Sequence, residues 1–109
     1  MDEIKALQEA INRFTEARDW DQFHNGKDLA IALSIEASEL LELFLWKRPE
    51  EVNREKVAEE LADVINYALL MASKYQLDVD AIVRQKIAKN AEKYPIEKAK
   101  GVATKYNEL

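Results

Sequence analysis

Four acidic side chains have the type and spacing of a metal site. Glu36 and Glu39 form a Glu-x-x-Glu pair in IEASELLELFLW, and Glu60 and Asp63 form a Glu-x-x-Asp pair in EELADVINYALLMA. Residues three apart on a helix share a face, so each pair would point two carboxylates in one direction. Both pairs lie in apolar sequence, where a lone carboxylate is costly unless it is paired, protonated or bound to a cation. Because all the ligand atoms are oxygens, we predict Mg²⁺, with Mn²⁺ as a second possibility, rather than zinc or copper.

Two other interpretations of these acids are open. A single Glu-x-x-Glu pair is common on solvated helix surfaces, and only the combination of two pairs in apolar surroundings is specific. A di-iron bundle also uses helical carboxylates, but it needs Glu-x-x-His on two helices. The only histidine, His24, lies outside any such motif, and the chain has no cysteine. Redox chemistry and thiolate sites are therefore disfavoured.

The elements that must position these acids are predicted to be helices. Apolar residues recur at helical spacing, as in the stripe formed by Ile4, Leu7, Ile11 and Phe14. We expect helices over residues 2–18, 28–47, about 49–75 and 79–93, an aromatic loop over 19–25, and a partly ordered tail over 96–109. Gly26 and Asp28 would mark the start of the second helix, and Pro49 with two acids the start of the third. A second helix reaching residue 47 would place Trp46 two turns beyond Glu39 on the same face.

Composition agrees with this helical pattern. The chain has 109 residues with only two glycines and two prolines, which favours one all-α domain over residues 1–109. We predict a four-helix bundle. The second half of the third helix is apolar almost all round, which requires burial on more than one side. Self-association is therefore expected to complete the bundle.

Charge and hydropathy disfavour several classes of partner. The net charge of −5 argues against a nucleic-acid-binding surface. No uninterrupted apolar run approaches the ~18 residues of a membrane span, and the first ten residues do not resemble a signal peptide. The absence of cysteine is compatible with a reducing compartment, and we expect a cytoplasmic protein.

Other side chains could bind a ligand beside the acids. On the fourth helix, Lys86, Asn90 and Lys93 lie within ~60° of one another around the helix axis. The default interpretation of such a face is a solvated surface. Contact with phosphate becomes the better interpretation only if the acids hold a metal. Trp20 and Trp46 are more often core residues than ligand contacts. His24 could be structural, or could contact a base.

The combination of motifs resembles the MazG-like all-α nucleoside triphosphate pyrophosphohydrolases. The resemblance covers nearly the whole chain and includes RDWDQFH, SIEASELLELFLWK, EELADVINYALLMA, KNAEKYP and KYNEL. Within that family the sequence is most similar to the dCTP pyrophosphatase branch. The connection KRPEEVNREK between the second and third helices is shorter than in the eukaryotic members of this branch.

This resemblance implies Mg²⁺-dependent hydrolysis of a nucleoside triphosphate, with dCTP or a 5-modified dCTP as the expected substrate. It implies a homotetramer built as a pair of dimers. It also implies roles for individual residues. The metal and the reaction are assigned to the four acids Glu36, Glu39, Glu60 and Asp63. The phosphates are assigned to the motif K-x-x-x-N-x-x-K-Y-P, which contains Lys86, Asn90, Lys93 and Tyr94, and the base is assigned to Trp20, His24 and Trp46. Water would be the nucleophile, with Glu39 as its base. The alternative is a non-catalytic helical module that oligomerises or binds metal.

Overall fold

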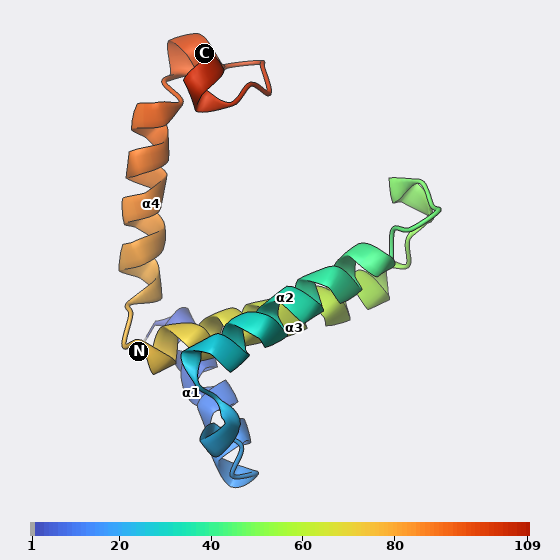
Figure 1. The fold of residues 1–109 in the computed structure, drawn as a ribbon, viewed down its shortest axis with the longest axis vertical. Helices are drawn as coiled ribbons and strands as arrows, with labels where there is room; N and C mark the ends of the chain where they lie inside the picture. Colours follow the sequence, from blue (N-terminus) through green and yellow to red (C-terminus); the bar gives the residue numbers. More distant parts are fainter. Residues whose placement is uncertain (1) are drawn as a thin grey trace. The chain divides into compact units, whose positions relative to one another are not determined.

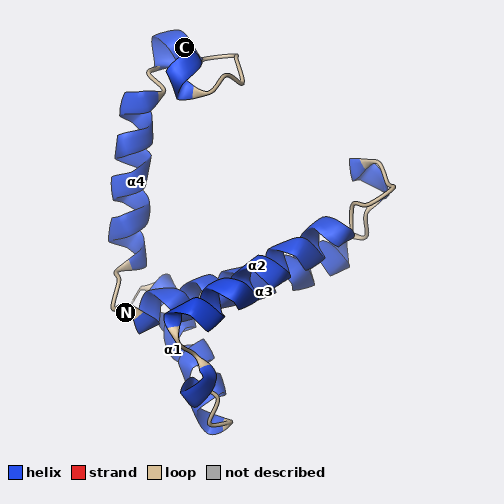
Figure 2. Ribbon diagram, viewed as in Figure 1, coloured by secondary structure: helices blue, strands red, loops and turns tan. Residues whose placement is uncertain are grey.

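All the regular structure in the described part of the chain is helical. The computed structural model describes residues 2–109, and Figures 1 and 2 show helices joined by loops with no strand in that range. The helices are α1 (Glu3–Ala17), α2 (Gly26–Glu42), α3 (Arg54–Lys74), α4 (Val79–Lys93) and α5 (Ile96–Ala99), with 3-10 turns at Asp21–Phe23, Pro49–Glu51 and Tyr106–Glu108. This confirms the predicted all-α class. Within residues 2–109, no helix is both long and apolar enough to cross a bilayer.

Residue contacts divide the chain into two compact units. The first ends at Leu77, and the second comprises Asp78–Leu109. In the first unit, α2 and α3 lie side by side along their length and α1 packs on α3 (Figure 1). The core contains Leu29 from α2 together with Leu69, Leu70 and Ala72 from α3. Assignment of the whole chain to one domain, and completion of the bundle by oligomerisation, stay predictions.

Short polar residues set where the helices begin. The Asn25 side chain accepts a hydrogen bond from the Asp28 backbone N–H at 2.8 Å, so α2 begins at Gly26 rather than at Asp28. Asn53 caps α3 in the same way, accepting from the N–H groups of Glu55 and Lys56. These caps set where α2 and α3 begin, and therefore how far each acid pair lies from the start of its helix.

The connection between α2 and α3 differs from the prediction. α2 ends at Glu42 instead of residue 47, and the chain turns through residues 43–46. Trp46 has a φ of 63°, in the left-handed region that a bulky residue rarely adopts, so it cannot continue the helical face of Glu39. Pro49 begins a 3-10 turn and not α3, because Asn53 provides the cap closer to the apolar sequence. The predicted helical position of Trp46 is therefore wrong.

The second unit contains α4, with the bounds that the sequence predicted. Asp78 caps it by accepting from the Ala81 N–H at 3.0 Å. The apolar residues Ile82, Val83 and Ile87 of α4 are not buried, and are 39%, 50% and 62% exposed. In the following segment, Tyr106 packs edge-on against Tyr94 with ring centroids 6.1 Å apart. The segment after Pro95 is thus tied to the end of α4.

Candidate metal centre and adjoining pocket

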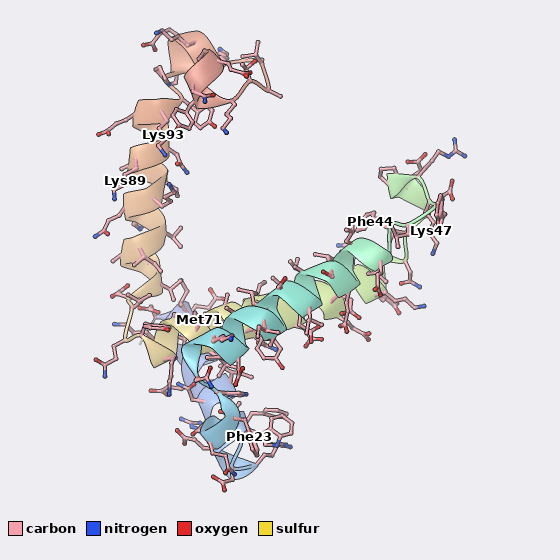
Figure 3. All side chains as sticks on the ribbon, in the orientation of Figure 1. Phe23, Phe44, Lys47, Met71, Lys89 and Lys93 are labelled. Carbon is pink, nitrogen blue, oxygen red and sulfur yellow. The ribbon has the colours of Figure 1, made fainter. Side chains whose placement is uncertain are left out.

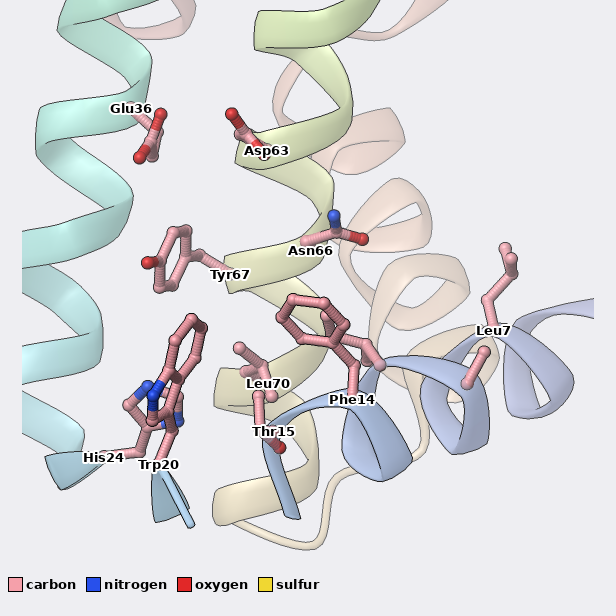
Figure 4. Close-up of a pocket in the computed structure, with 12 residues that line it drawn as sticks. Leu7, Phe14, Thr15, Trp20, His24, Glu36, Asp63, Asn66, Tyr67 and Leu70 are labelled. Carbon is pink, nitrogen blue, oxygen red and sulfur yellow. The ribbon is translucent and has the colours of Figure 1, made fainter. Parts of the chain in front are cut away.

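Three of the four predicted acids converge between α2 and α3. Glu36, Glu60 and Asp63 each offer one carboxylate oxygen, and these three oxygens lie within 4.8 Å of one another. Glu36 and Glu60 are half-buried, whereas Asp63 is exposed. Figure 4 shows Glu36 on α2 facing Asp63 on α3. The antiparallel packing of α2 against α3 (Figure 1) therefore brings together residues that are 27 positions apart (36 to 63) in the sequence.

Burial and mutual repulsion change the protonation of these acids. Burial, then the adjacent Glu39, and then the charges of Asp63 and Glu60 raise the pKa of Glu36 from 4.5 to about 7. The pKa of Glu60 is also raised, first by burial and then by the charges of Glu39 and Asp63. Glu39 is thus close enough to act on both residues, although it lies outside the converging triad. The four acids form one electrostatic cluster.

The triad fits a hard divalent cation. The Oε2 atoms of Glu36 and Glu60 are buried without a hydrogen-bond partner in the described residues. None of the salt bridges within residues 2–109 involves the cluster. Oxygens around one octahedral Mg²⁺ at ~2.1 Å lie roughly 3–4 Å apart, so only a small side-chain adjustment is needed. The arrangement can hold a divalent metal ion, which would satisfy both unpaired oxygens.

A pocket of about 450 Å³ adjoins the triad. Its lining changes from acidic at one end to apolar and aromatic at the other (Figure 4), and consists of Leu7, Ala10, Ile11, Phe14, Thr15, Trp20, His24, Glu36, Asp63, Asn66, Tyr67 and Leu70. Trp20 packs edge-on against Phe14, with centroids 5.6 Å apart. A volume of this order is typical of small-molecule sites. The pocket therefore offers one molecule both a cation site and an aromatic surface.

Two of the three predicted base contacts line this pocket. Trp20 and His24 lie near one another at its aromatic end (Figure 4). Trp46 is 100% exposed on the α2–α3 connection and does not line the pocket. Phe44 and Lys47, its neighbours on that connection, also project from the ribbon (Figure 3). The structure thus brings Trp20 and His24 together with the acids, and a base contact from Trp46 stays a prediction.

The predicted phosphate contacts lie in the second unit. Lys86, Asn90 and Lys93 are exposed on α4, and Figure 3 shows Lys93 near the end of that helix. The Lys93 Nζ lies 4.8 Å from the centre of the Tyr106 ring, and Tyr94 packs on the same ring. Contact between these residues and phosphate stays a prediction.

Two further polar residues, which the sequence pattern did not predict to be part of the site, line the pocket. Tyr67 lies one helical turn after Asp63, and burial followed by the charges of Glu36, Asp63 and Glu39 raises its pKa above 10. Asn66 lines the pocket beside it. Their spacing from Asp63 was a usable signal, because residues three and four positions apart share a helix face. Phe14, which belongs to the predicted apolar stripe of the first helix, is 44% exposed and lines the pocket.

Comparisons with known proteins agree with this architecture. The family model of the MazG-like family matches residues 31–109. Proteins named dCTP pyrophosphatase 1 are similar to the chain: that of Bos taurus is 38% identical over 104 residues, and that of Homo sapiens also 38% over 104, in each case across 88% of this chain. The chain spans about three fifths of these relatives, 62% and 61% respectively.

A solved structure gives the same result for the fold. The crystal structure of a pyrophosphatase from Archaeoglobus fulgidus superposes with a TM-score of 0.82 at 34% identity, covering 87% of this chain and 94% of that one. The family model covers more than half of the chain and includes both acid pairs. On this evidence the chain belongs to the MazG-like family.

Proposed function

We propose that the protein hydrolyses a nucleoside triphosphate to the monophosphate and pyrophosphate in a Mg²⁺-dependent reaction. The observation that carries this proposal is the triad of Glu36, Glu60 and Asp63, with two buried oxygens that lack a partner. The relatives named dCTP pyrophosphatase 1 support dCTP as the substrate. A 5-modified dCTP is the second substrate that we propose. Such a substrate carries several negative charges, and the acid cluster would repel it unless a cation lay between them.

In this proposal, Glu36, Glu60 and Asp63 hold the metal and Glu39 accepts a proton. Bound Mg²⁺ would supply charge neutralisation, polarisation of the α-phosphate and a lowered pKa for water. Water attacks the α-phosphorus, the bond from that phosphorus to the bridging oxygen of the β-phosphate breaks, and pyrophosphate leaves. Glu39 is the candidate base because it adjoins Glu36 and Glu60 but is not part of the converging triad.

The remaining predicted residues are given binding roles. Trp20 and His24 line the aromatic end of the pocket, where an indole can stack on a base. The side chains of Lys86, Asn90, Lys93 and Tyr94 would contact the phosphates and offset the charge of the leaving group. Since stacking accepts any base, it supplies affinity and leaves discrimination to other groups.

We also propose that the protein works as an oligomer, a tetramer formed by two dimers, in the cytoplasm. Large apolar side chains are exposed on α2, on α3 and on the connection between them, namely Ile31, Ile35, Leu41, Leu45, Trp46, Leu61 and Ile65. Trp46 is fully exposed in a backbone conformation that costs free energy. A partner subunit covering Trp46 would offset that cost, and could bring it to the base held by Trp20.

The activity is tested by measuring pyrophosphate release from a panel of dCTP, dTTP, dUTP, dATP and CTP, with Mg²⁺ and with EDTA. We expect release that requires metal, with dCTP as a good substrate. Release equal to the enzyme-free blank for every nucleotide would leave the non-catalytic helical module as the better interpretation. Sedimentation tests the assembly separately, since a folded monomer at micromolar concentration would contradict it. The substitution Ile35→Lys should weaken the oligomer without touching the acid triad.

A further inference from the structure

Asn66 is a polar side chain on an otherwise apolar wall of the pocket. It lies on α3 between Asp63 and Leu70, and it is half-buried. Figure 4 shows its amide on the side of α3 where α1 runs, pointing away from Tyr67. The α1 residues that line this wall are all apolar except Thr15, whose hydroxyl already donates to the Asn12 backbone carbonyl at 3.0 Å.

The Asn66 amide makes no hydrogen bond to any residue in the described part of the chain. By contrast, the half-buried Asn12 on α1 donates from Nδ2 to the Ser73 hydroxyl at 3.4 Å. The polar atoms of the Asn66 amide are not among the fully buried ones, so they stay accessible from the pocket. Helix α1 cannot supply a backbone partner from its middle turns, because those carbonyls accept bonds within the helix. Asn66 is therefore a hydrogen-bonding group that the fold itself leaves unused, directed at the pocket.

We infer that Asn66 is a base-contact residue that hydrogen-bonds the edge of the pyrimidine and accepts cytosine, uracil and thymine alike. The inference rests on the proposed function. Asp63, three residues earlier, is ~4.5 Å along the helix axis, and Asp63, Asn66 and Trp20 all line the same pocket, so a nucleotide that runs from the triad to Trp20 follows a pocket that Asn66 lines. Asn66 is the neutral hydrogen-bonding group on that path that is able both to donate and to accept at two adjacent atoms.

The chemistry of the amide explains the lack of discrimination. With one orientation, Oδ1 accepts from the cytosine amino group while Nδ2 donates to ring N3. After a 180° rotation of the amide, Oδ1 accepts from N3–H of uracil or thymine while Nδ2 donates to O4. No hydrogen bond from another described residue holds the Asn66 amide in either orientation. Both base edges therefore find a complementary partner at the same side chain.

The test compares Asn66→Leu with the matched control Asn12→Leu. Both changes replace a half-buried asparagine in the first unit with an apolar residue of similar size, but only Asn66 lines the large pocket. For Asn66→Leu we expect KM for dCTP and dTTP to rise about tenfold or more with kcat nearly unchanged, and Tm to be equal or higher. For Asn12→Leu we expect a lower Tm and an unchanged KM, because it loses the bond to Ser73.

A second measurement separates contact with the base from contact with the phosphates. The probe is 2′-deoxyribose 5′-triphosphate, which has no base, used as a competitor in the presence of Mg²⁺. It should inhibit wild type and Asn66→Leu equally. In wild type, kcat/KM for dCTP and dTTP should agree within about tenfold.

Each failure has a distinct meaning. Two results with an active wild type would overturn the inference and leave the proposed function intact. One is an unchanged KM in Asn66→Leu, and the other is inhibition by the abasic competitor that weakens in Asn66→Leu as much as KM rises. If kcat/KM for one pyrimidine nucleotide exceeded that for the other by more than a hundredfold, the Asn66 amide would not rotate freely between its two orientations, and the inference would be wrong. A wild type that hydrolyses no nucleotide and binds no competitor would remove the proposed function itself.

Discussion

Replacing Glu36 with glutamine should stabilise the metal-free protein at neutral pH and above. The pKa of Glu36 is about 7 in the fold against an ordinary value of 4.5. Between these two pH values the unfolded chain has lost this proton and the folded chain keeps it, so stability falls as pH rises through that window. At ~1.36 kcal/mol per pH unit, the difference of 2.5 corresponds to an upper limit of about 3.4 kcal/mol.

Solvent screening reduces this limit. The cluster adjoins an open pocket and Asp63 is exposed, so we expect about 1–2 kcal/mol. For a domain of this size, that corresponds to a Tm change of roughly 4–10 °C. Glutamine removes the charge at residue 36 and can donate a hydrogen bond to the remaining carboxylates. The pKa of Glu60 is also raised, so the stability of the variant should still depend on pH, but less strongly.

The assay is thermal unfolding at pH 5 and pH 8, with EDTA or with Mg²⁺. In EDTA, the Tm of wild type should fall between pH 5 and pH 8. The Tm of Glu36→Gln should fall less, and at pH 8 it should be higher than that of wild type. Addition of Mg²⁺ should raise the Tm of wild type by an amount that grows with concentration, and that of Glu36→Gln much less. The matched control is Glu42→Gln, an exposed acid at the end of the same helix, which should behave as wild type.

Two results would refute this reasoning. If the Tm of metal-free wild type did not change from pH 5 to pH 8, Glu36 would not be held protonated by its surroundings. If Mg²⁺ stabilised Glu36→Gln as strongly as wild type, the triad would not be the cation site.

Three further predictions address the site and the core. Asp63→Asn should lower turnover at limiting Mg²⁺ by at least a hundredfold while circular dichroism stays helical, because one of the three converging oxygens is lost; wild-type turnover would contradict the ligand assignment. Trp20→Ala should raise KM for dCTP more than it lowers kcat in steady-state kinetics, since stacking on a base is worth roughly 1–3 kcal/mol; an unchanged KM would exclude Trp20 from the base site. Leu29→Ala should cost about 2–5 kcal/mol in urea unfolding, because Leu29 is 2% exposed; a loss below 1 kcal/mol would show that the core adjusts.

The sequence alone predicted the all-helical class and the clustering of acidic residues. Helical periodicity and the scarcity of glycine and proline identified α1, α4 and the end of α3 nearly to the residue, whereas the predicted start of α3 was five residues too early. Two acid pairs in apolar sequence predicted a cation site, because the free-energy cost of an unpaired carboxylate is local chemistry that requires no tertiary information. The end of α2 was predicted less well: apolar residues continue beyond Glu42, but the backbone turns through residues 43–46.

Only the tertiary structure decided which side chains share a space. It brought Glu36 to within 4.8 Å of Glu60 and Asp63, and it left Glu39 beside that triad rather than in it. It placed Asn66 and Tyr67 in the same pocket as Trp20, residues whose sequence separation carries no information about distance. Helical spacing determines the face on which a residue lies, whereas the packing of α1, α2 and α3 determines what that face meets. For this reason the acidic faces were predictable from spacing within single helices, and the wall that carries Asn66 was not.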